Sequence, residues 1–442
     1  MKLFGTEKDS TGRRTYFFGL KVYEEIKRWN TKKTYFLGIK IRKKKQKNDN
    51  TTQHLTDFRA RIYAAEQRIL SLGLYYRDLP ENERFVLCFD YLAYPFAEAI
   101  DAWTFFQYLQ TQGIPSKYVI RKENDLFKKL QREGKLKDIL PVSNELQVLT
   151  DYPNIIAKSR LIISSFGFEL SQFFKFLPFC KYIFIEHGVN FLKDWAVKHY
   201  SASRFGGILV PSRLTKSAYD ENGVDYETCI PYYSGLPRWD KLELTDKNKK
   251  VTRRKIFIFF TWRTSFTSNL QLRHEYITRI KSFIKRLVNI FSESNDIEIN
   301  LSLHHALLER DSGFKGKELF QHVHFVPMSD ISSMVREADL CITDYSSISF
   351  DFLYRNTPVV FYCFDSDINY PNKKDSIKST IEKIRKHLYN CCIDEDSAVS
   401  LVKYYTDRNF ALEPEHIEKN NQIFWFRGGN CERLWNLINE TK

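Results

Sequence analysis

The stretch Leu340-Cys-Ile-Thr-Asp-Tyr-Ser-Ser-Ile-Ser-Phe-Asp351 decides the fold, because an apolar run leads through a polar cluster directly into a helical pattern. Asp344 and Ser346 are good helix N-caps, and Thr357-Pro358 predicts the end of the helix. A strand that leads into a helix N-terminus leaves several backbone N–H groups unpaired and directed at one point. Together with the helix dipole, these groups predict an anion-binding site. An ordinary capped helix is the alternative explanation.

Three side chains could extend this predicted site. Ser346 and Ser347 add hydroxyl donors beside the backbone N–H groups. Asp351 lies four residues after Ser347, which places it one turn further along the same face of the predicted helix.

The alternation of apolar runs and helical patterns extends outward from this stretch to residue 84 on one side and to the last helix, near 431–438, on the other. The other strand-like runs lie at 85–89, 117–120, 138–142, 161–164, 182–186, 207–210, 256–260, 297–303, 323–326 and 359–362. Continuous apolar strands between helices are typical of a parallel sheet with helices on both faces. The charged stretch 241–255 predicts a linker, so we expect two Rossmann-type halves in a GT-B-like arrangement.

Length and composition narrow the class of protein. The chain of 442 residues is long enough for two or three domains. Its eight cysteines are scattered without a CxxC pair, which predicts a reducing cytosol, no disulfide framework and no zinc site. The first residues lack the apolar core of a signal peptide, and no apolar run approaches the roughly 18 residues of a membrane span.

The positive charge is concentrated in the first 50 residues. They contain 15 Lys and Arg against 5 Asp and Glu, a net charge of +10 out of +14 for the whole chain. Two similar segments, Arg14-Thr-Tyr-Phe-Phe-Gly-Leu-Lys21 and Lys33-Thr-Tyr-Phe-Leu-Gly-Ile-Lys40, combine aromatic residues with flanking cations. This pattern suits an anionic membrane surface. A β-hairpin appendage with a solvated basic rim is an alternative, and nucleic-acid binding is disfavoured because no recognised motif follows.

Polar clusters directly follow several of the predicted strands, where parallel sheets bind their ligands. They are Glu186-His187-Gly188, Gly235–Asp240, Thr261-Trp262-Arg263, His304-His305 and Asp344–Asp351. Each has an ordinary explanation by itself, since a strand-end histidine is often structural and Arg238 or Arg263 could form a surface ion pair.

In combination these clusters resemble the CDP-glycerol glycerophosphotransferase family, the teichoic-acid and capsule polymerases with a GT-B-type fold. The matching motifs are His187-Gly188 followed by Lys193, Gly-x-Pro-Arg-x-Asp at Gly235–Asp240, and Asp-Tyr-Ser-Ser-x-x-Phe-Asp at Asp344–Asp351. Phe260 stands where the family usually has proline before Thr-Trp-Arg, and His305 replaces the proline after the second histidine, His304. The resemblance covers residues 84–440 and leaves out the first 80.

The resemblance implies a domain organisation and a reaction. Residues 1–53 would form the basic arm and linker, 54–245 the acceptor domain, and 246–442 the nucleotide-donor domain, with a central cleft between the two domains. The implied enzyme transfers a polyol phosphate, most simply glycerol phosphate, from a CDP-polyol to a hydroxyl of a growing cell-surface polymer and releases CMP. A GT-B glycosyltransferase that uses a nucleotide sugar and a non-enzymatic scaffold are the alternatives.

The resemblance also implies roles for individual residues. His187 and His304 are the predicted catalytic residues, with His187 as the base and His304 near the phosphates or the leaving group. The predicted substrate-binding residues are Gly188, Arg238, Asp240, Arg263, Asp344, Ser346, Ser347 and Asp351. The two arginines could neutralise the diphosphate, whereas the carboxylates more plausibly orient neighbouring groups or the ribose.

We expect no metal-containing cofactor, with assistance by a divalent cation such as Mg²⁺ left open. The predicted partners are the CDP-polyol, a lipid-linked or oligomeric polymer acceptor, and an anionic membrane surface that binds residues 1–50. No nucleic acid is expected. These partners imply a cytoplasmic protein attached peripherally to the inner face of the cell membrane. The sequence leaves open which polyol is transferred and whether one unit or a whole polymer is added.

Overall fold

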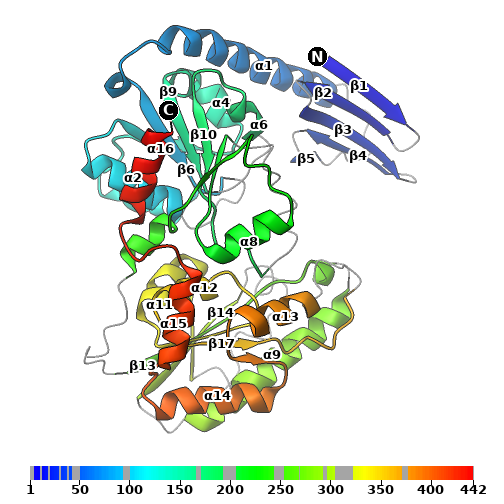
Figure 1. Ribbon diagram of the computed structural model, residues 1–442. Helices are drawn as coiled ribbons and strands as arrows, with labels where there is room; N and C mark the ends of the chain where they lie inside the picture. The colour runs from blue at the N-terminus through cyan, green and yellow to red at the C-terminus, as the bar shows by residue number, and fades with distance from the viewer. Residues whose placement is uncertain are drawn as a thin grey trace.

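The computed structural model describes residues 4–9, 12–17, 20–28, 31–36, 39–41, 50–92, 100–165, 171–192, 206–242, 253–267, 269–291, 296–303, 322–370 and 377–441. These residues form an antiparallel sheet near the N-terminus and two α/β units, each built around its own sheet (Figure 1). The two α/β sheets are parallel throughout, which confirms the predicted fold class.

The first unit contains a seven-stranded sheet with the order β12-β11-β10-β9-β6-β7-β8. Its strands are β6 (Phe85–Phe89), β7 (Ser116–Arg121), β8 (Ile139–Val142), β9 (Ser159–Ser164), β10 (Lys181–Phe184), β11 (Gly207–Leu209) and β12 (Ile230–Tyr232). The central strands are almost fully buried, which explains why they appear in the sequence as continuous apolar runs.

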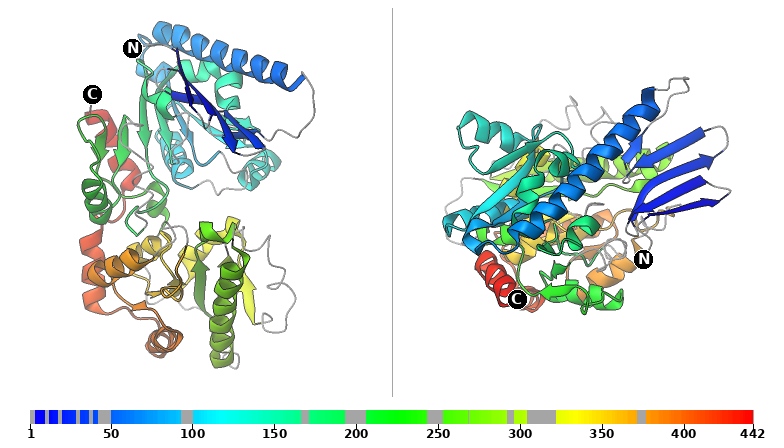
Figure 2. Two further views of the ribbon diagram at one scale, coloured as in Figure 1. Left: turned by 90° about the vertical axis from the view of Figure 1, so that its right-hand side faces the viewer. Right: turned by 90° about the horizontal axis from the view of Figure 1, so that it is seen from above.

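Helices cover both faces of this sheet. They are α2 (Asp101–Thr111), α3 (Asp125–Arg132), α4 (Gln147–Asp151), α5 (Pro153–Ala157), α6 (Ser171–Lys175) and α8 (Arg213–Glu221). The long helix α1 (Asn50–Tyr76) packs against α4 and α5, and Figure 2 shows it lying across the top of the unit. No helix among the described residues is both long and apolar enough to cross a membrane.

The second unit contains a six-stranded sheet with the order β15-β14-β13-β16-β17-β18. Its strands are β13 (Arg254–Phe260), β14 (Ile297–Leu303), β15 (Val323–Phe325), β16 (Leu340–Thr343), β17 (Val359–Tyr362) and β18 (Cys391–Cys392). Its main helices are α9 (Leu270–Phe291), α11 (Ile331–Glu337), α12 (Ser349–Tyr354), α13 (Lys378–His387), α14 (Glu395–Asp407) and α15 (Pro414–Ile423).

The last helix, α16 (Asn430–Glu440), returns to the first unit, where it packs against α2 and β12 (Figure 1). Its end is held there by hydrogen bonds of Thr441 with Lys181 and with Tyr232. The domain boundaries at residues 54 and 246 remain predictions, but the sequence assigned α16 to the second domain, and its packing partners belong to the first.

The described part of the basic arm is a five-stranded antiparallel sheet with the strand order β1-β2-β3-β4-β5. Its strands are β1 (Phe4–Asp9), β2 (Gly12–Phe17), β3 (Leu20–Arg28), β4 (Thr31–Phe36) and β5 (Ile39–Ile41). The register pairs Phe17 with Leu20 and Phe36 with Ile39, so each copy of the sequence repeat spans the corner between two strands. The expected appendage is therefore a sheet rather than a single hairpin.

The helix after β16 begins later than the sequence predicts. Helix α12 has six residues, and its N-cap position is Ile348, which makes no side-chain cap. Ser346 does accept a hydrogen bond from the N–H of Ile348 at 3.4 Å. Asp344, however, uses its carboxylate to bind the end of β13, so the predicted helix cap at Asp344 is wrong. Contact with the neighbouring strand replaces the local hydrogen bonds that a cap would form.

Candidate active site

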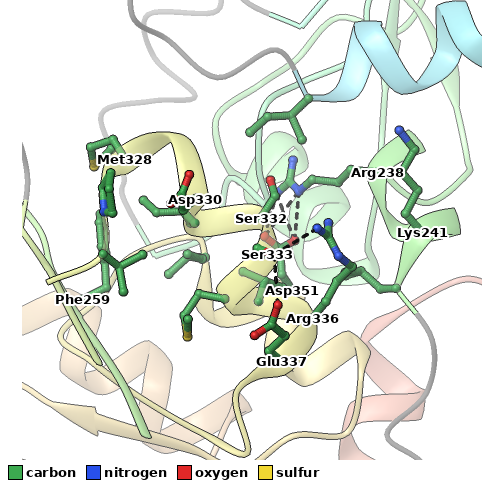
Figure 3. A pocket seen from close by; sticks show the side chains of 18 of the residues that line it. Arg238, Lys241, Phe259, Met328, Asp330, Ser332, Ser333, Arg336, Glu337 and Asp351 are labelled. Atoms are coloured by element: carbon green, nitrogen blue, oxygen red, sulfur yellow. Dashed lines mark hydrogen bonds and ion pairs between the residues drawn. The ribbon is translucent and has the colours of Figure 1, made fainter. Parts of the chain in front are cut away.

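A cleft of about 1320 Å³ lies between the two units. Five of the predicted site residues line it, from both units and the segment between them: His187, Arg238, Ser346, Ser347 and Asp351. Figure 3 shows the part of this cleft beside α11, where Arg238 meets Asp351 and the side chains of Lys241 and Arg336 lie nearby. The cleft therefore brings together predicted site residues that are up to 164 positions apart in the sequence, from His187 to Asp351.

The His187-Gly188 motif follows the end of β10. His187 is exposed to the cleft, whereas the residues on either side of it are buried. A Cβ atom added at Gly188 would lie only 2.9 Å from the Oγ of Ser347. A larger residue here would crowd Ser347, because the backbone of the first unit passes directly against the serine pair of the second.

Arg238 joins the two units through two carboxylates. Its Nη1 is ion-paired with Asp101 on α2, and its Nη2 lies 3.0 Å from Oδ1 of Asp351 on α12. Both carboxylates are buried, and Nη1 also donates to the backbone carbonyl of His187 at 3.3 Å. These two carboxylates raise the pKa of Arg238 despite the opposing effect of burial. Arg238 thus already has anionic partners, which any substrate phosphate has to share or replace.

The remaining residues of the Gly235–Asp240 motif hold the last helix in place. A Cβ atom at Gly235 would lie 2.3 Å from the Oδ1 of Asn430, so only glycine fits against the start of α16. Asp240 accepts from the backbone N–H groups of Asn430 and Cys431, both at 2.7 Å. Asp240 therefore caps α16 rather than facing the cleft, so the geometry gives no support to its predicted substrate contact.

Asp344 and Arg263 form a buried cluster behind the serine pair. Nη1 of Arg263 lies 2.8 Å from Oδ2 of Asp344, and Nη2 lies 2.8 Å from Oδ2 of Asp365. Asp344 also accepts from the N–H of Thr261 at 3.1 Å. All three charged side chains are fully buried, and neither Asp344 nor Arg263 is among the described residues that line the cleft. In this structure the cluster locks the ends of β13 and β16 together.

Two predicted residues lie outside the residues that the structure describes. One is His304, the second predicted catalytic residue, and the other is Lys193 of the His-Gly motif. Their predicted roles therefore remain predictions.

The cleft also contains charged residues that the sequence interpretation missed. Asp101 carried no local signal, because its role depends on Arg238, 137 positions later. Asp90 directly follows β6 and could have been found by the rule that singled out the other strand ends. It accepts from the N–H groups of Ala102 and Trp103, both at 3.0 Å, and so fixes the start of α2. Lys129, Lys241 and Arg336 add exposed cations to the cleft.

Among the described residues, no group of three or more His, Cys, Asp or Glu side chains is arranged to hold a metal ion. Three of the carboxylates that line the cleft are instead occupied by protein donors: Asp90 by α2 and Tyr118, and Asp101 and Asp351 by Arg238. All eight cysteines are free.

Three curated proteins are similar to this chain in sequence. Minor teichoic acid biosynthesis protein GgaB of Bacillus subtilis is 20% identical over 354 residues, which are 75% of this chain and 37% of that protein. The teichoic acid poly(ribitol-phosphate) polymerase of Bacillus spizizenii is 26% identical over 180 residues, 38% of this chain and 28% of the polymerase. The poly(glycerol phosphate) polymerase of the same organism is 26% identical over 188 residues, 40% of this chain and 43% of the polymerase. The chain thus spans less than half the length of each relative.

Solved structures agree on the fold. A variant of the wall teichoic acid polymerase TagF superposes with a TM-score of 0.56 at 16% identity, over 89% of this chain and 98% of the other. A TagF variant soaked with CDPG gives a TM-score of 0.53 at 16% identity, over 88% and 96% of the two chains. A putative UDP-N-acetylglucosamine 2-epimerase from Listeria monocytogenes gives 0.50 at 13% identity, over 80% and 95%. Two such units around a cleft constitute the predicted GT-B-like fold.

The family comparison covers parts of both α/β units. A model described as CDP-Glycerol:Poly(glycerophosphate) glycerophosphotransferase matches residues 137–384, more than half of the chain. The matched residues include the His187-Gly188 segment, Arg238 and the serine pair, all of which meet at the cleft. The chain therefore belongs to the CDP-glycerol:poly(glycerophosphate) glycerophosphotransferase family.

Proposed function

We propose that this protein transfers a polyol phosphate from a CDP-polyol to a hydroxyl group of a growing polymer. The acceptor oxygen attacks the phosphorus attached to the polyol and forms a new phosphodiester bond. The bond from that phosphorus to the bridging oxygen breaks, and the bridging oxygen leaves with CMP. The acceptor proton passes to a base on the protein, and the net negative charge of the diphosphate has to be neutralised throughout.

The observation that carries this proposal is the contact of the His187-Gly188 segment with Ser347 across the cleft. It supports a site in which a base from the first unit faces a phosphate bound by the second. Ser346 and Ser347 supply hydroxyl donors for the diphosphate, while helix α12 is too short to supply a strong dipole. His187 is the proposed base because an imidazole has a pKa near neutral pH.

The cations of the cleft suit an anionic donor and acceptor. Lys241 and Arg336 make only neutral hydrogen bonds among the contacts described, to Gln107 and to Ser333. Their charges remain available to phosphate groups, whereas Arg238 can exchange Asp101 or Asp351 for a substrate oxygen. In this proposal Arg263 and Asp344 stabilise the site from behind the serine pair, and His304 acts near the leaving phosphate.

Glycerol phosphate is the proposed unit, since the family is described by that reaction. Ribitol phosphate is the main alternative, because the poly(ribitol-phosphate) and poly(glycerol phosphate) polymerases have the same sequence identity to this chain, 26% over the matched residues. The proposed acceptor is a lipid-linked or oligomeric polymer of the cell surface. A GT-B glycosyltransferase has the same two-unit fold, so fold alone does not separate the two activities, and family membership favours the polyol phosphate.

We further propose that residues 1–50 attach the protein to the cytoplasmic face of an anionic membrane. The support is their net charge of +10, because each Lys or Arg near an anionic surface contributes about 1 kcal/mol. Binding to anionic vesicles should fall steeply as salt approaches 0.15 M, where the Debye length is about 8 Å. Deleting residues 1–50 should abolish binding to the vesicles. Equal vesicle binding by the full-length and truncated proteins would exclude the arm as the anchor.

The activity is tested by CMP release from a panel of CDP-glycerol, CDP-ribitol and nucleotide sugars, with and without an oligomeric acceptor. Acceptor-dependent CMP release from one CDP-polyol supports the proposal, and release of a nucleotide from a sugar donor alone contradicts it. Ser346→Ala with Ser347→Ala should raise the KM for the donor without moving the pH profile. Unchanged donor affinity in that variant would remove the serine pair from the phosphate site.

A further inference from the structure

Glu186, the residue before His187, has an unusual conformation and environment. Its φ angle is +62°, in the left-handed region that residues other than glycine rarely adopt. Its side chain is fully buried, although a glutamate is seldom buried without a partner. The strand ladder continues up to Ile185, whose N–H donates to the carbonyl of Ser164 at 2.8 Å. The left-handed residue therefore turns the chain out of the sheet directly before His187.

The carboxyl group of Glu186 is held from two directions. The hydroxyl of Tyr219, on helix α8, donates to Oε1, and the side-chain amide of Asn190 donates to Oε2 at 2.7 Å. The backbone N–H of His187 also hydrogen-bonds the carboxyl group and lowers its pKa. Glu186 thus connects the backbone of His187 to α8 and to the loop that follows.

We propose that Glu186 is a positioning residue that fixes the backbone of His187 and directs its imidazole into the cleft. The inference rests on the proposed role of His187 as the base. Three anchors converge on one buried side chain, and they maintain a backbone angle that would otherwise relax. Because proton transfer depends on the placement of the base, a misplaced imidazole should slow turnover without changing donor binding.

Burial explains why a neutral side chain should be able to replace Glu186. Burial raises the pKa of Glu186 to about 8, against the lowering effect of Tyr219, Asn190 and the His187 N–H. The charged or titratable groups that face it are Tyr219 on α8, Asp101 on α2, and His187 beside it; Asp101 raises the pKa further. Glu186 is therefore mostly protonated at pH 7, and glutamine reproduces its shape and neutral hydrogen bonding.

Three substitutions separate the side chain from the backbone. Glu186→Gln keeps a neutral side chain of the same shape, in which the amide oxygen can still accept from Asn190 while the amide NH2 donates to the Tyr219 hydroxyl. Glu186→Gly keeps the left-handed backbone without the side chain, and Glu186→Ala removes both. We expect near-wild-type kcat for Glu186→Gln. For the glycine and alanine variants we expect kcat to fall on the order of 10²-fold, with the KM for CDP-glycerol unchanged. Wild-type kcat in Glu186→Gly would overturn the proposal, because the backbone angle alone would then suffice.

A second measurement keeps the test independent of the reaction. The ¹³Cε1 signal of His187, assigned with a His187→Gln variant, is recorded without substrate in each protein. We expect the signal to keep its position in Glu186→Gln at pH 7 and to shift or broaden in Glu186→Ala and in Tyr219→Phe. The Tyr219→Phe variant provides the test if the alanine variant fails to fold. An unchanged signal in these last two variants would refute positioning by Glu186. If the wild type releases no CMP, the proposed function fails while this signal still decides the inference.

Discussion

Asp351 of the second α/β unit accepts hydrogen bonds from Arg238, which belongs to the segment that closes the first unit, with Nε of Arg238 3.1 Å from Oδ1 of Asp351. The indole Nε1 of Trp239 donates to the same oxygen at 2.6 Å. Trp239 is itself buried and stacked on Tyr354, with ring centroids 4.4 Å apart. A single carboxylate therefore fixes two consecutive side chains of the interunit segment, and it lies at the edge of the cleft.

Arg238→Ala should destabilise the protein strongly, because it leaves Asp101 and Asp351 buried without their cation. Removing one partner of a buried ion pair typically costs about 3–5 kcal/mol. Thermal unfolding should show a large fall in Tm relative to Arg408→Ala, a control at an exposed arginine on the surface of the second unit. A Tm equal to that of the control would mean that the two carboxylates have other partners in solution.

Gly188→Ala should impair turnover because the new Cβ would press on Ser347, 2.9 Å from its Oγ and 3.1 Å from its Cβ. Adding Ser347→Gly removes both contacts but also a proposed donor to the diphosphate, so the double variant should lose less donor affinity than the sum of the losses in the two single variants. The coupling energy from a double-mutant cycle in KM measures this contact. Strictly additive effects of the two substitutions would show that the segments do not touch.

Arg263→Met should act on stability rather than on the substrate. The substitution leaves Asp344 and Asp365 buried and unpaired, at a cost of about 3–5 kcal/mol. The Tm should therefore fall, while the folded fraction should keep its KM for the donor. The conservative Arg263→Lys distinguishes the two roles: an unchanged Tm with a raised donor KM would favour the direct phosphate contact that the family resemblance implies.

Glu186 should make stability depend on pH. Its pKa is about 8 in the folded protein and close to 4.5 in an unfolded chain. Between these values the folded state binds one proton more than the unfolded state, so raising the pH favours unfolding by about 1.4 kcal/mol per pH unit. The free energy of unfolding of the wild type relative to Glu186→Gln should thus decrease from pH 5 to pH 8 and level off above.

Urea titrations of the two proteins at matched pH values would measure that difference. A wild-type stability that runs parallel to Glu186→Gln across this range would mean that Glu186 is ionised in the folded protein.

The sequence was sufficient to predict the elements that depend on local pattern. Strands β6, β14 and β17 have the predicted boundaries, because each is an apolar run with clear flanking residues. The alternation of strands and helices along the sequence likewise predicted the two parallel sheets. The sequence analysis did not identify helices α13, α14 and α15. Each has only a few buried positions, and its many polar and charged residues obscure the helical periodicity of those positions.

The roles of individual site residues were harder to predict, because they depend on partners far away in the chain. Asp344 looked like a helix cap in its local context, but it binds Thr261, directly after the end of the neighbouring strand β13. Asp240 looked like a site residue because of its motif, yet its partners are Asn430 and Cys431 at the start of α16. A motif thus marked the right region, while tertiary contacts determined which of its side chains face the cleft.

We propose that the cleft transfers polyol phosphate with His187 as the base. The most direct measurement is CMP release from CDP-glycerol, with an oligomeric acceptor, by the wild type and by His187→Ala at equal melting temperature. We predict acceptor-dependent release by the wild type and a loss of about 10²–10⁴-fold in kcat for the variant, as for the removal of a positioned acid–base group. Turnover by His187→Ala at the wild-type rate would show that His187 is not the base.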